Sequence, residues 1–169
     1  MKKIIVLLFL IMFLITGCAR FNPGEYVIPE DGGFLAVINS LYTPEDISNY
    51  MLTNFTYEAH GFIVQTPYEL YLSKKGDCDE FSNFGVWVAN FHGYETWQIQ
   101  IFDNSFYSHY VAVYNEGIWL SITDNQYYFS GFDNFMDIVE YVYYIRDKVW
   151  TKYIVYDFDN NIIEKGYNK

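Results

Sequence analysis

The spacing of apolar residues changes near the middle of the chain. Before Gly93 they recur every three or four positions, as Phe81, Phe84, Val88 and Phe91 do. That spacing places them on one face of a helix. After Gly93, apolar and polar residues alternate in several short segments, which is the pattern of β-strands. Helices followed by strands predict an α+β fold, in which N-terminal helices pack on an antiparallel sheet.

Three of the predicted helices have clear start signals. Thr43 and Thr66 can each cap a helix, and the proline that follows each of them suits the first helical position. Glu69 completes a capping box in the second case, and Asp77 can cap the third helix after the break at Gly76. The predicted helices run from Thr43 to about Glu58, from Thr66 to Tyr71 or Leu72, from Asp77 to about His92, and from about Asp133 to Arg146.

The second half of the chain is predicted to supply the sheet. The predicted strands are Glu95 to Phe102, His109 to Tyr114, Ile118 to Thr123, Trp150 to Phe158 and Ile162 to Tyr167. Asn115-Glu116-Gly117 joins the second and third strands as a hairpin. If Glu116 and Gly117 form a two-residue loop, His109 lies directly opposite Asp124. A three-residue loop would set Thr123 opposite His109 instead.

The N-terminus has the layout of an export signal. Lys2 and Lys3 precede 12 apolar residues, Ile4 to Ile15, a run shorter than the ~20 residues that span a bilayer. The segment Ile15-Thr16-Gly17-Cys18 resembles the bacterial lipobox, which implies cleavage before Cys18 and attachment of lipid to it. An ordinary cleaved signal or an uncleaved anchor is the alternative.

The lipobox interpretation predicts the domain organisation and the location of the protein. We expect a signal peptide over residues 1–17, a lipidated tether over 18–33 containing Pro23 and Pro29, and one domain over 34–169. The protein is then an exported lipoprotein, anchored in the membrane at the bacterial cell envelope. Cleavage leaves 8 basic and 21 acidic residues, which argues against nucleic acid as a partner. The 18 tyrosines favour a peptide or protein partner.

Cys78 is the only cysteine besides Cys18, so the mature chain has no partner for an intramolecular disulfide. It falls in the first turn of a predicted helix, where unpaired backbone N–H groups and the helix dipole favour a thiolate. Asp77 and Asp79 oppose that effect because they place negative charge beside the thiol. A reactive cysteine is therefore one interpretation, and a buried small apolar residue is the other.

A reactive cysteine needs a base, and the chain has three histidines. His60 and His92 each precede a glycine at a predicted helix end, where histidine commonly complements the dipole. His109 instead begins a strand, and the two-residue hairpin loop would bring Asp124 beside it. Asp124 can equally form a turn with the asparagine that follows it.

The segments GDCDEFSNFGVWVANFHG and HYVAVYNEGIWLSITDN resemble the transglutaminase-like superfamily, whose papain-like core uses Cys, His and Asp in that order. The resemblance implies that Cys78 is the nucleophile, His109 the base and later the acid, and Asp124 the carboxylate that orients the histidine. An aromatic residue, commonly tryptophan, often follows the family's histidine, whereas Tyr110 or Val111 stands there in this chain.

The resemblance implies acyl transfer at amide bonds without a cofactor. The reaction is peptide or protein hydrolysis, as in a cysteine peptidase, or transglutaminase-type amide exchange. The Cys78 N–H would bind the oxyanion, and a second donor is sought among Gln65, Tyr68 and Tyr71. An inactive, lipid-anchored protein-binding module is the alternative.

A zinc site is a further alternative. Cys78, His109 and Asp124 could hold the metal as three ligands, although they lie far apart in the sequence for such a site. We therefore expect no metal.

Overall fold

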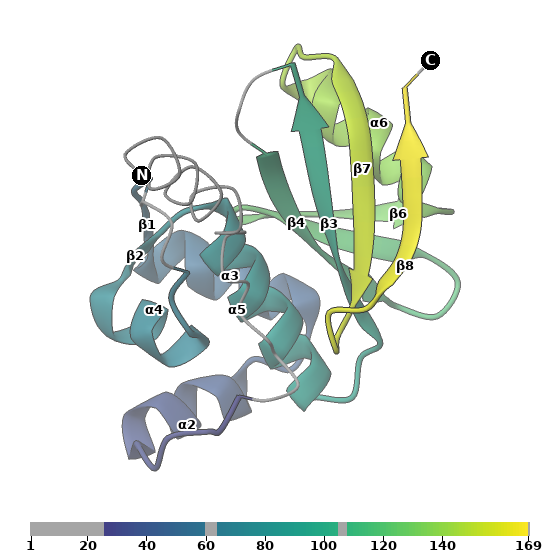
Figure 1. Cartoon of the computed structure of the whole chain (residues 1–169). Helices are drawn as coiled ribbons and strands as arrows, with labels where there is room; N and C mark the ends of the chain where they lie inside the picture. The colour runs from purple at the N-terminus through teal and green to yellow at the C-terminus, as the bar shows by residue number, and fades with distance from the viewer. Residues whose placement is uncertain (1–25, 60–63, 105–107, 169) are drawn as a thin grey trace, which may run out of the picture.

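The computed structural model describes residues 26–59, 64–104 and 108–168, and within them the predicted α+β class is confirmed (Figure 1). The helices are α2 (Gly32–Ser40), α3 (Pro44–Asn54), α4 (Pro67–Ser73), α5 (Cys78–Phe91) and α6 (Phe135–Ile145). The strands of the main sheet are β3 (Thr96–Asp103), β4 (Ser108–Asn115), β5 (Leu120–Asp124), β6 (Tyr127–Phe132), β7 (Trp150–Asp157) and β8 (Ile162–Tyr167). A short parallel pair, β1 (Thr56–Tyr57) and β2 (Lys75–Gly76), lies outside it.

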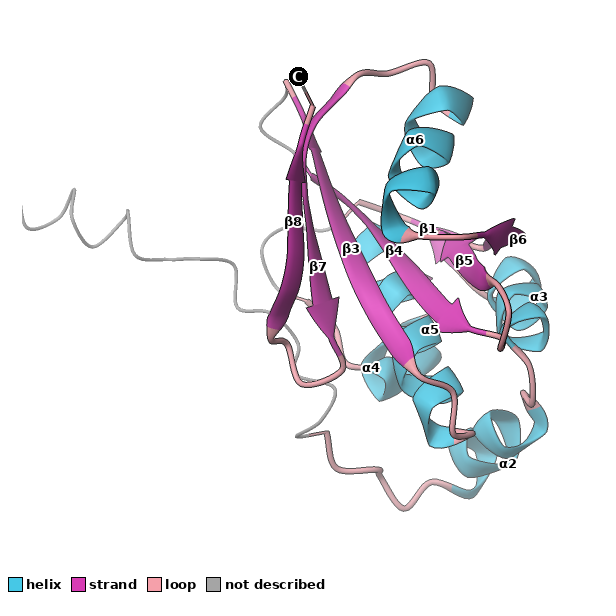
Figure 2. Cartoon of the chain, turned by 90° about the vertical axis from the view of Figure 1, so that its right-hand side faces the viewer, coloured by secondary structure: helices cyan, strands magenta, loops and turns pink. Residues whose placement is uncertain are grey.

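The main sheet is antiparallel throughout, with strand order β6-β5-β4-β3-β7-β8. Four consecutive strands, β3 to β6, form a meander. The chain then passes through α6 and returns as β7 on the free edge of β3. In Figure 2, β5 and β6 lie between α6 and α3, so these two helices are on opposite sides of this part of the sheet.

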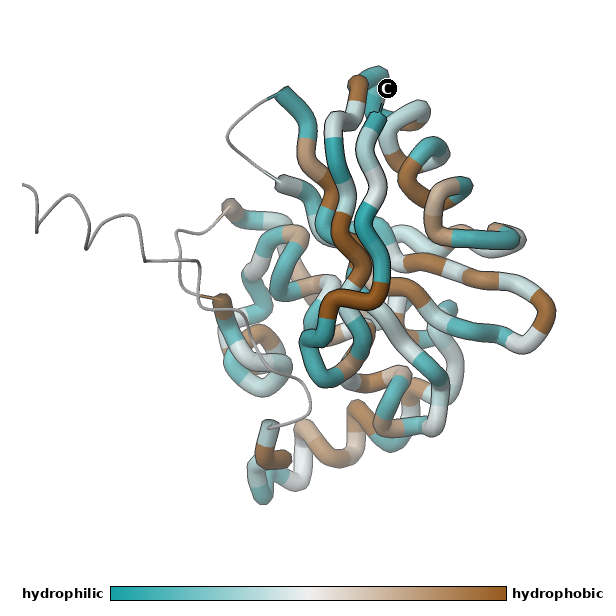
Figure 3. The backbone as a smooth tube through the Cα atoms, turned by 45° about the vertical axis from the view of Figure 1, so that its right-hand side comes forward, coloured by the Kyte–Doolittle hydropathy of each residue, from teal (hydrophilic) through white to brown (hydrophobic). Residues whose placement is uncertain are grey.

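Two apolar cores lie on the two faces of the sheet, and alternate residues of β4 divide between them. Ala112 and Tyr114 are fully buried against the N-terminal helices. Val111 and Val113 are fully buried in the core that contains α6. Figure 3 shows the apolar segments of the chain along the central strands and the inner sides of the helices. Each fully buried large apolar side chain contributes about 1.5–3 kcal/mol.

The predicted helix starts are confirmed by their caps. Thr43, Thr66 and Asp77 each form a complete capping box with an acid three residues later. These boxes satisfy backbone N–H groups that have no partner within the helix. None of the helices in the described part of the chain is long and apolar enough to cross a membrane.

The first predicted helix is too long at its end, because α3 stops at Asn54 and not at Glu58. Phe55 is extended, and the chain continues as β1, which pairs with β2. The backbone N–H of Glu58 donates to the Gly76 carbonyl at 2.8 Å. This pairing with a distant segment satisfies the backbone groups that further helical turns would have used.

Besides the short β1–β2 pair, helix α2 and strand β6 were not predicted from the sequence. Helix α2 begins at Gly32, inside the predicted tether, because Asp31 caps it by accepting the Phe34 N–H at 2.8 Å. Tyr26 also packs its ring edge-to-face on Trp87 of α5, with centroids 5.1 Å apart. The domain therefore includes residues before the predicted boundary at 34. Strand β6 was missed as well, and it adds an outer strand to the sheet beside β5.

Candidate functional site

Cys78 is the first residue of α5, as predicted, and its side chain is partly exposed. Asp77 caps the helix, and its own N–H donates to Glu80 Oε2 at 2.6 Å. The Cys78 thiol is hydrogen-bonded to the backbone of Tyr110 on β4. Because Tyr110 follows His109 directly, this contact brings the helix start to the residue next to the candidate base.

A glycine allows α5 to pack closely on β4. At Gly85, a Cβ atom would collide with the Tyr114 hydroxyl and would come within 3.2 Å of the Ala112 Cβ. The absence of a side chain therefore lets the helix backbone approach the strand. This close packing carries the thiol toward the start of β4.

The predicted hairpin register is wrong by two residues. Asp124 pairs with Val111, and Asn115 pairs with Leu120, so the loop has four residues, Glu116 to Trp119. The Asn115 side chain accepts the Gly117 N–H at 2.9 Å, which turns the chain early and leaves Ile118 and Trp119 in the loop. A shift of two positions keeps every residue on its face of the sheet. His109 and Asp124 are consequently diagonal neighbours on one face.

His109 and Asp124 are hydrogen-bonded despite the changed register. His109 Nε2 lies 2.7 Å from Asp124 Oδ1, and the two side chains are only 13% and 5% exposed. Burial raises the pKa of Asp124, but the hydrogen bond and charge of His109, together with Arg146, outweigh it and hold the pKa below its ordinary value. When Nε2 carries the proton it donates to Asp124 Oδ1, because an ionised carboxylate only accepts. In the neutral ring, Nδ1 then has the free lone pair.

Arg146 is a member of this cluster that the sequence analysis missed. Its Nη2 lies 2.5 Å from Asp124 Oδ1 and 2.9 Å from His109 Nε2. The sequence places Arg146 at the end of a predicted helix, where a basic residue normally just complements the dipole. Because Arg146 lies far from Asp124 in the sequence, no local pattern predicted their contact. The contact arises because α6 crosses the face of the sheet that carries both partners.

The helix terminus does not make Cys78 acidic in this structure, contrary to the sequence-based expectation. Burial raises the pKa of its thiol to about 12. The backbone hydrogen bond from Tyr110 and the charge of Arg146 lower the pKa, while Asp77 and Asp79 raise it. Desolvation disfavours the thiolate more than the hydrogen bond from Tyr110 and the charge of Arg146 favour it. The thiol is therefore protonated at neutral pH.

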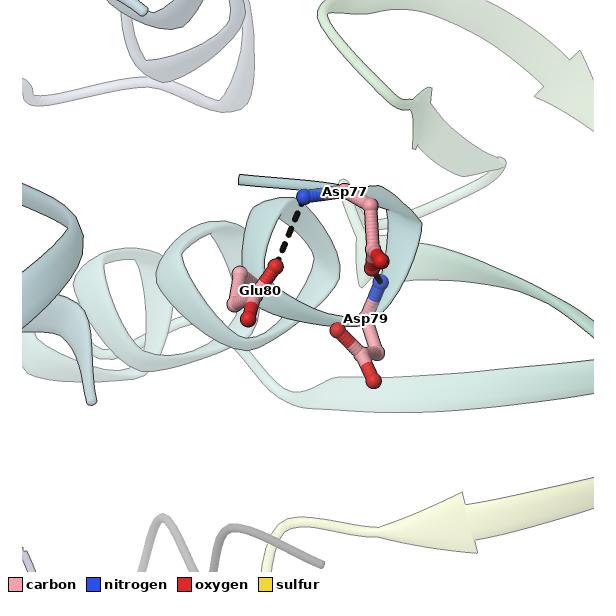
Figure 4. Close-up of side chains that lie close together, drawn as sticks. All are labelled: Asp77, Asp79 and Glu80. Atoms are coloured by element: carbon pink, nitrogen blue, oxygen red, sulfur yellow. Dashed lines mark hydrogen bonds between the residues drawn. The ribbon is translucent and has the colours of Figure 1, made fainter. Parts of the chain in front are cut away.

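Three acids surround the start of α5 (Figure 4). The carboxylates of Asp77, Asp79 and Glu80 lie within 4.8 Å of one another. Burial, followed by the hydrogen bond and charge of Asp77, raises the pKa of Asp79 to about 8. The carboxylates of Asp77 and Glu80 already bind backbone N–H groups of the capping box.

The three residues of the zinc alternative are not grouped closely enough to share a metal ion. In the part of the chain that the structure describes, the three acids are the only group of three or more potential ligands close enough to share a metal ion. Cys78, His109 and Asp124 do not form such a group, so the geometry does not favour the zinc alternative.

Two tyrosines near Cys78 were not predicted. Tyr57 of β1 is 51% exposed, and Tyr143 of α6 is 3% exposed. Burial is the main cause that raises the pKa of each, and the negative charge of a Cys78 thiolate adds to it. The charge of Arg146 acts on both hydroxyls in the opposite direction. The two rings therefore lie in the same neighbourhood as the thiol and the guanidinium.

The three predicted oxyanion donors have other contacts. Gln65 Nε2 donates to the Lys75 carbonyl at 2.9 Å. The Tyr68 hydroxyl donates to Asp31 at 3.0 Å, and the Tyr71 ring packs on Phe34 of α2. Gln65 is thus bound to β2, and the two tyrosines contact residues of α2 and its cap. None of these contacts involves Cys78.

His92 has no part in this cluster. His92 ends α5 and donates from Nε2 to the Ile38 carbonyl at 2.7 Å, which agrees with a structural role. His60 and Cys18 lie outside the described residues. Comparison with known proteins finds no family model that matches the chain and no curated protein that matches it in sequence.

Proposed function

We propose that the protein is a membrane-tethered thiol enzyme that acts on amide bonds by acyl transfer. The observation that carries this proposal is the buried hydrogen bond between His109 and Asp124, on the strand that contacts Cys78. A nucleophile, a base and a group that orients the base form the general pattern of such sites. The resemblance of the same segments to the transglutaminase-like superfamily agrees with it and implies a papain-like core.

The proposed reaction begins with proton transfer, because the thiol is neutral at rest. His109 Nδ1 takes the thiol proton as Sγ attacks the amide carbonyl carbon. The C–N bond then breaks, and the amine leaves with the proton returned by His109. Water or a second amine, deprotonated by His109, attacks the thioester carbon and restores the Cys78 thiol. The first acceptor gives hydrolysis, and the second gives amide exchange.

The start of α5 suits the charge that develops in this reaction. The Cys78 N–H belongs to the first helical turn, whose amides have no partner within the helix and point their dipoles outward. We propose it as one oxyanion donor. Asp124 stabilises the imidazolium that forms transiently on His109.

The alternative is an inactive, lipid-anchored protein-binding module, and one observation favours it. The high pKa of the Cys78 thiol, caused mainly by its burial, leaves almost no thiolate at neutral pH. An enzyme must overcome this through the base, whereas a binding module has no need to.

Incubation with a peptide library, with and without a small primary amine, tests the proposed function. Mass spectrometry separates the outcomes, because hydrolysis yields two fragments, whereas amide exchange yields a peptide joined to the amine. We expect conversion that disappears in Cys78→Ala. No conversion of any peptide, together with retained binding of some of them, would support the binding module instead.

We also propose that Cys18 carries lipid and anchors the protein at the bacterial cell envelope. The basic and apolar lead and the lipobox-like residues Ile15 to Cys18 support this proposal. Mass spectrometry of the N-terminal peptide should show an acylated Cys18, and the protein should sediment with membranes. In Cys18→Ser the lipid should be absent. An unmodified N-terminus at Ala19 or later would contradict the lipoprotein assignment.

A further inference from the structure

We propose that Arg146 is a positioning residue of this site: its guanidinium holds Asp124 as an ionised, oriented carboxylate and places a fixed positive charge near Cys78. This inference rests on the proposed thiol chemistry and adds a fourth residue to it. Arg146 acts on the reaction through Asp124 and through its field, and it has no covalent step of its own.

The geometry around Asp124 calls for a permanent cation. The carboxylate is 5% exposed, and an ionised group so deeply buried is costly unless it is paired and hydrogen-bonded. A neutral His109 supplies one hydrogen bond and no charge. Arg146 supplies the charge at 2.5 Å from the same oxygen, Oδ1. The carboxylate therefore stays ionised and fixed while His109 gains and loses its proton.

The side chain of Arg146 is not needed to end its helix. The Asp147 N–H donates to the Tyr144 carbonyl, and the Lys148 N–H donates to the Tyr143 carbonyl, at 3.2 and 3.1 Å. These backbone bonds satisfy two carbonyls in the last turn of α6 without the Arg146 side chain. The guanidinium is therefore available to bind Asp124 and His109. Its Nε is buried with no hydrogen-bond partner among the described residues.

Removal of the positive charge of Arg146 should raise the pKa of both Asp124 and Cys78. The charge and hydrogen bond of Arg146 lower the pKa of Asp124, and its charge lowers that of Cys78. Without them, the carboxylate takes up a proton at higher pH and the thiolate forms at higher pH. The other titratable groups facing the pair are His109 of β4, Tyr57 of β1, Tyr141 and Tyr143 of α6, and Asp77 and Asp79 at the start of α5.

The test is the pH profile of Cys78 alkylation by iodoacetamide, followed by mass spectrometry of the Cys78 peptide in the full chain. Arg146→Gln keeps a hydrogen-bond donor and removes the charge, whereas Arg146→Lys keeps the charge. We expect the profile of Arg146→Gln to move up by about half a pH unit, equivalent to about threefold slower labelling at a given pH. Arg146→Lys should restore most of the rate.

Lys148→Gln is the matched control, because Lys148 lies two residues away and pairs with Asp103 at 3.1 Å. It should leave the profile unchanged. An unchanged profile in Arg146→Gln, or equal shifts in the Gln and Lys variants, would overturn the inference. Alkylation needs no substrate, so this result is independent of the peptide assay. Thermal unfolding of each variant shows whether a shift reflects the charge or a loss of structure.

Discussion

Cys78→Ala is expected to abolish turnover of any peptide that the protein converts, a loss of about 10⁶-fold by comparison with other covalent catalysts. No other group in the proposed site can form the thioester, so the effect exceeds that of any other single change. Cys78 is partly exposed as a residue, and its thiol is hydrogen-bonded to the backbone of Tyr110. The free energy of unfolding should therefore change by only about 1 kcal/mol.

The measurement is the rate of product formation from the peptide identified in the library, read by mass spectrometry. Cys78→Ser is the matched variant, because it keeps the size and the hydrogen-bonding capacity of the side chain while removing the thiol. It should also be inactive or nearly so. Turnover within tenfold of the parent protein in either variant would show that Cys78 is not the nucleophile.

Asp124→Asn is expected to leave the fold intact and to lower turnover by about 10⁴-fold, as loss of a triad carboxylate does elsewhere. An asparagine amide can donate to His109 Nε2 as well as accept from it, so the ring loses control of its tautomer. The imidazolium also loses the negative charge that stabilises it. Because Arg146 remains, the variant places two cationic groups together whenever His109 is protonated.

A turn residue would behave differently in this experiment. Asparagine serves an Asx-turn as well as aspartate does, so a purely structural Asp124 would tolerate the change. The carboxylate of Asp124 binds His109 and Arg146, whereas the turn after β5 is made by Asn125 with a φ of 53°. Asp103→Asn is the control, since Asp103 pairs with Lys148, and it should keep turnover unchanged. Activity of Asp124→Asn within a few-fold of the parent would reject its role.

Local sequence signals predicted most of the helices because those signals act within a few residues. The N-caps Thr43, Thr66 and Asp77 were all predicted correctly, and each belongs to a capping box that needs only the four residues that form it. Strand β6 and the β1–β2 pair were missed, because a strand is stabilised by a partner that can lie far along the chain. Thr56 pairs with Lys75, for example, across the whole of α4.

The hairpin shows how a wrong register can still yield the correct pair. The loop length depends on the side-chain contact between Asn115 and Gly117, which the pattern of apolar residues does not report. The predicted alternation was nevertheless correct, because a shift of two residues preserves the faces of both strands. His109 and Asp124 thus share a face, and the imidazole ring reaches the carboxylate across the diagonal between them.

The sequence by itself placed Cys78 at the start of a helix, His109 at the start of a strand and Asp124 at the end of the next one, because each position follows from local periodicity and capping. Only tertiary packing buries the thiol and places Arg146 beside Asp124. Desolvation depends on every segment that covers a group, and α6 must cross the sheet before its last turn can reach Asp124. The order of the candidate residues is local information, whereas their charge states are a property of the folded chain.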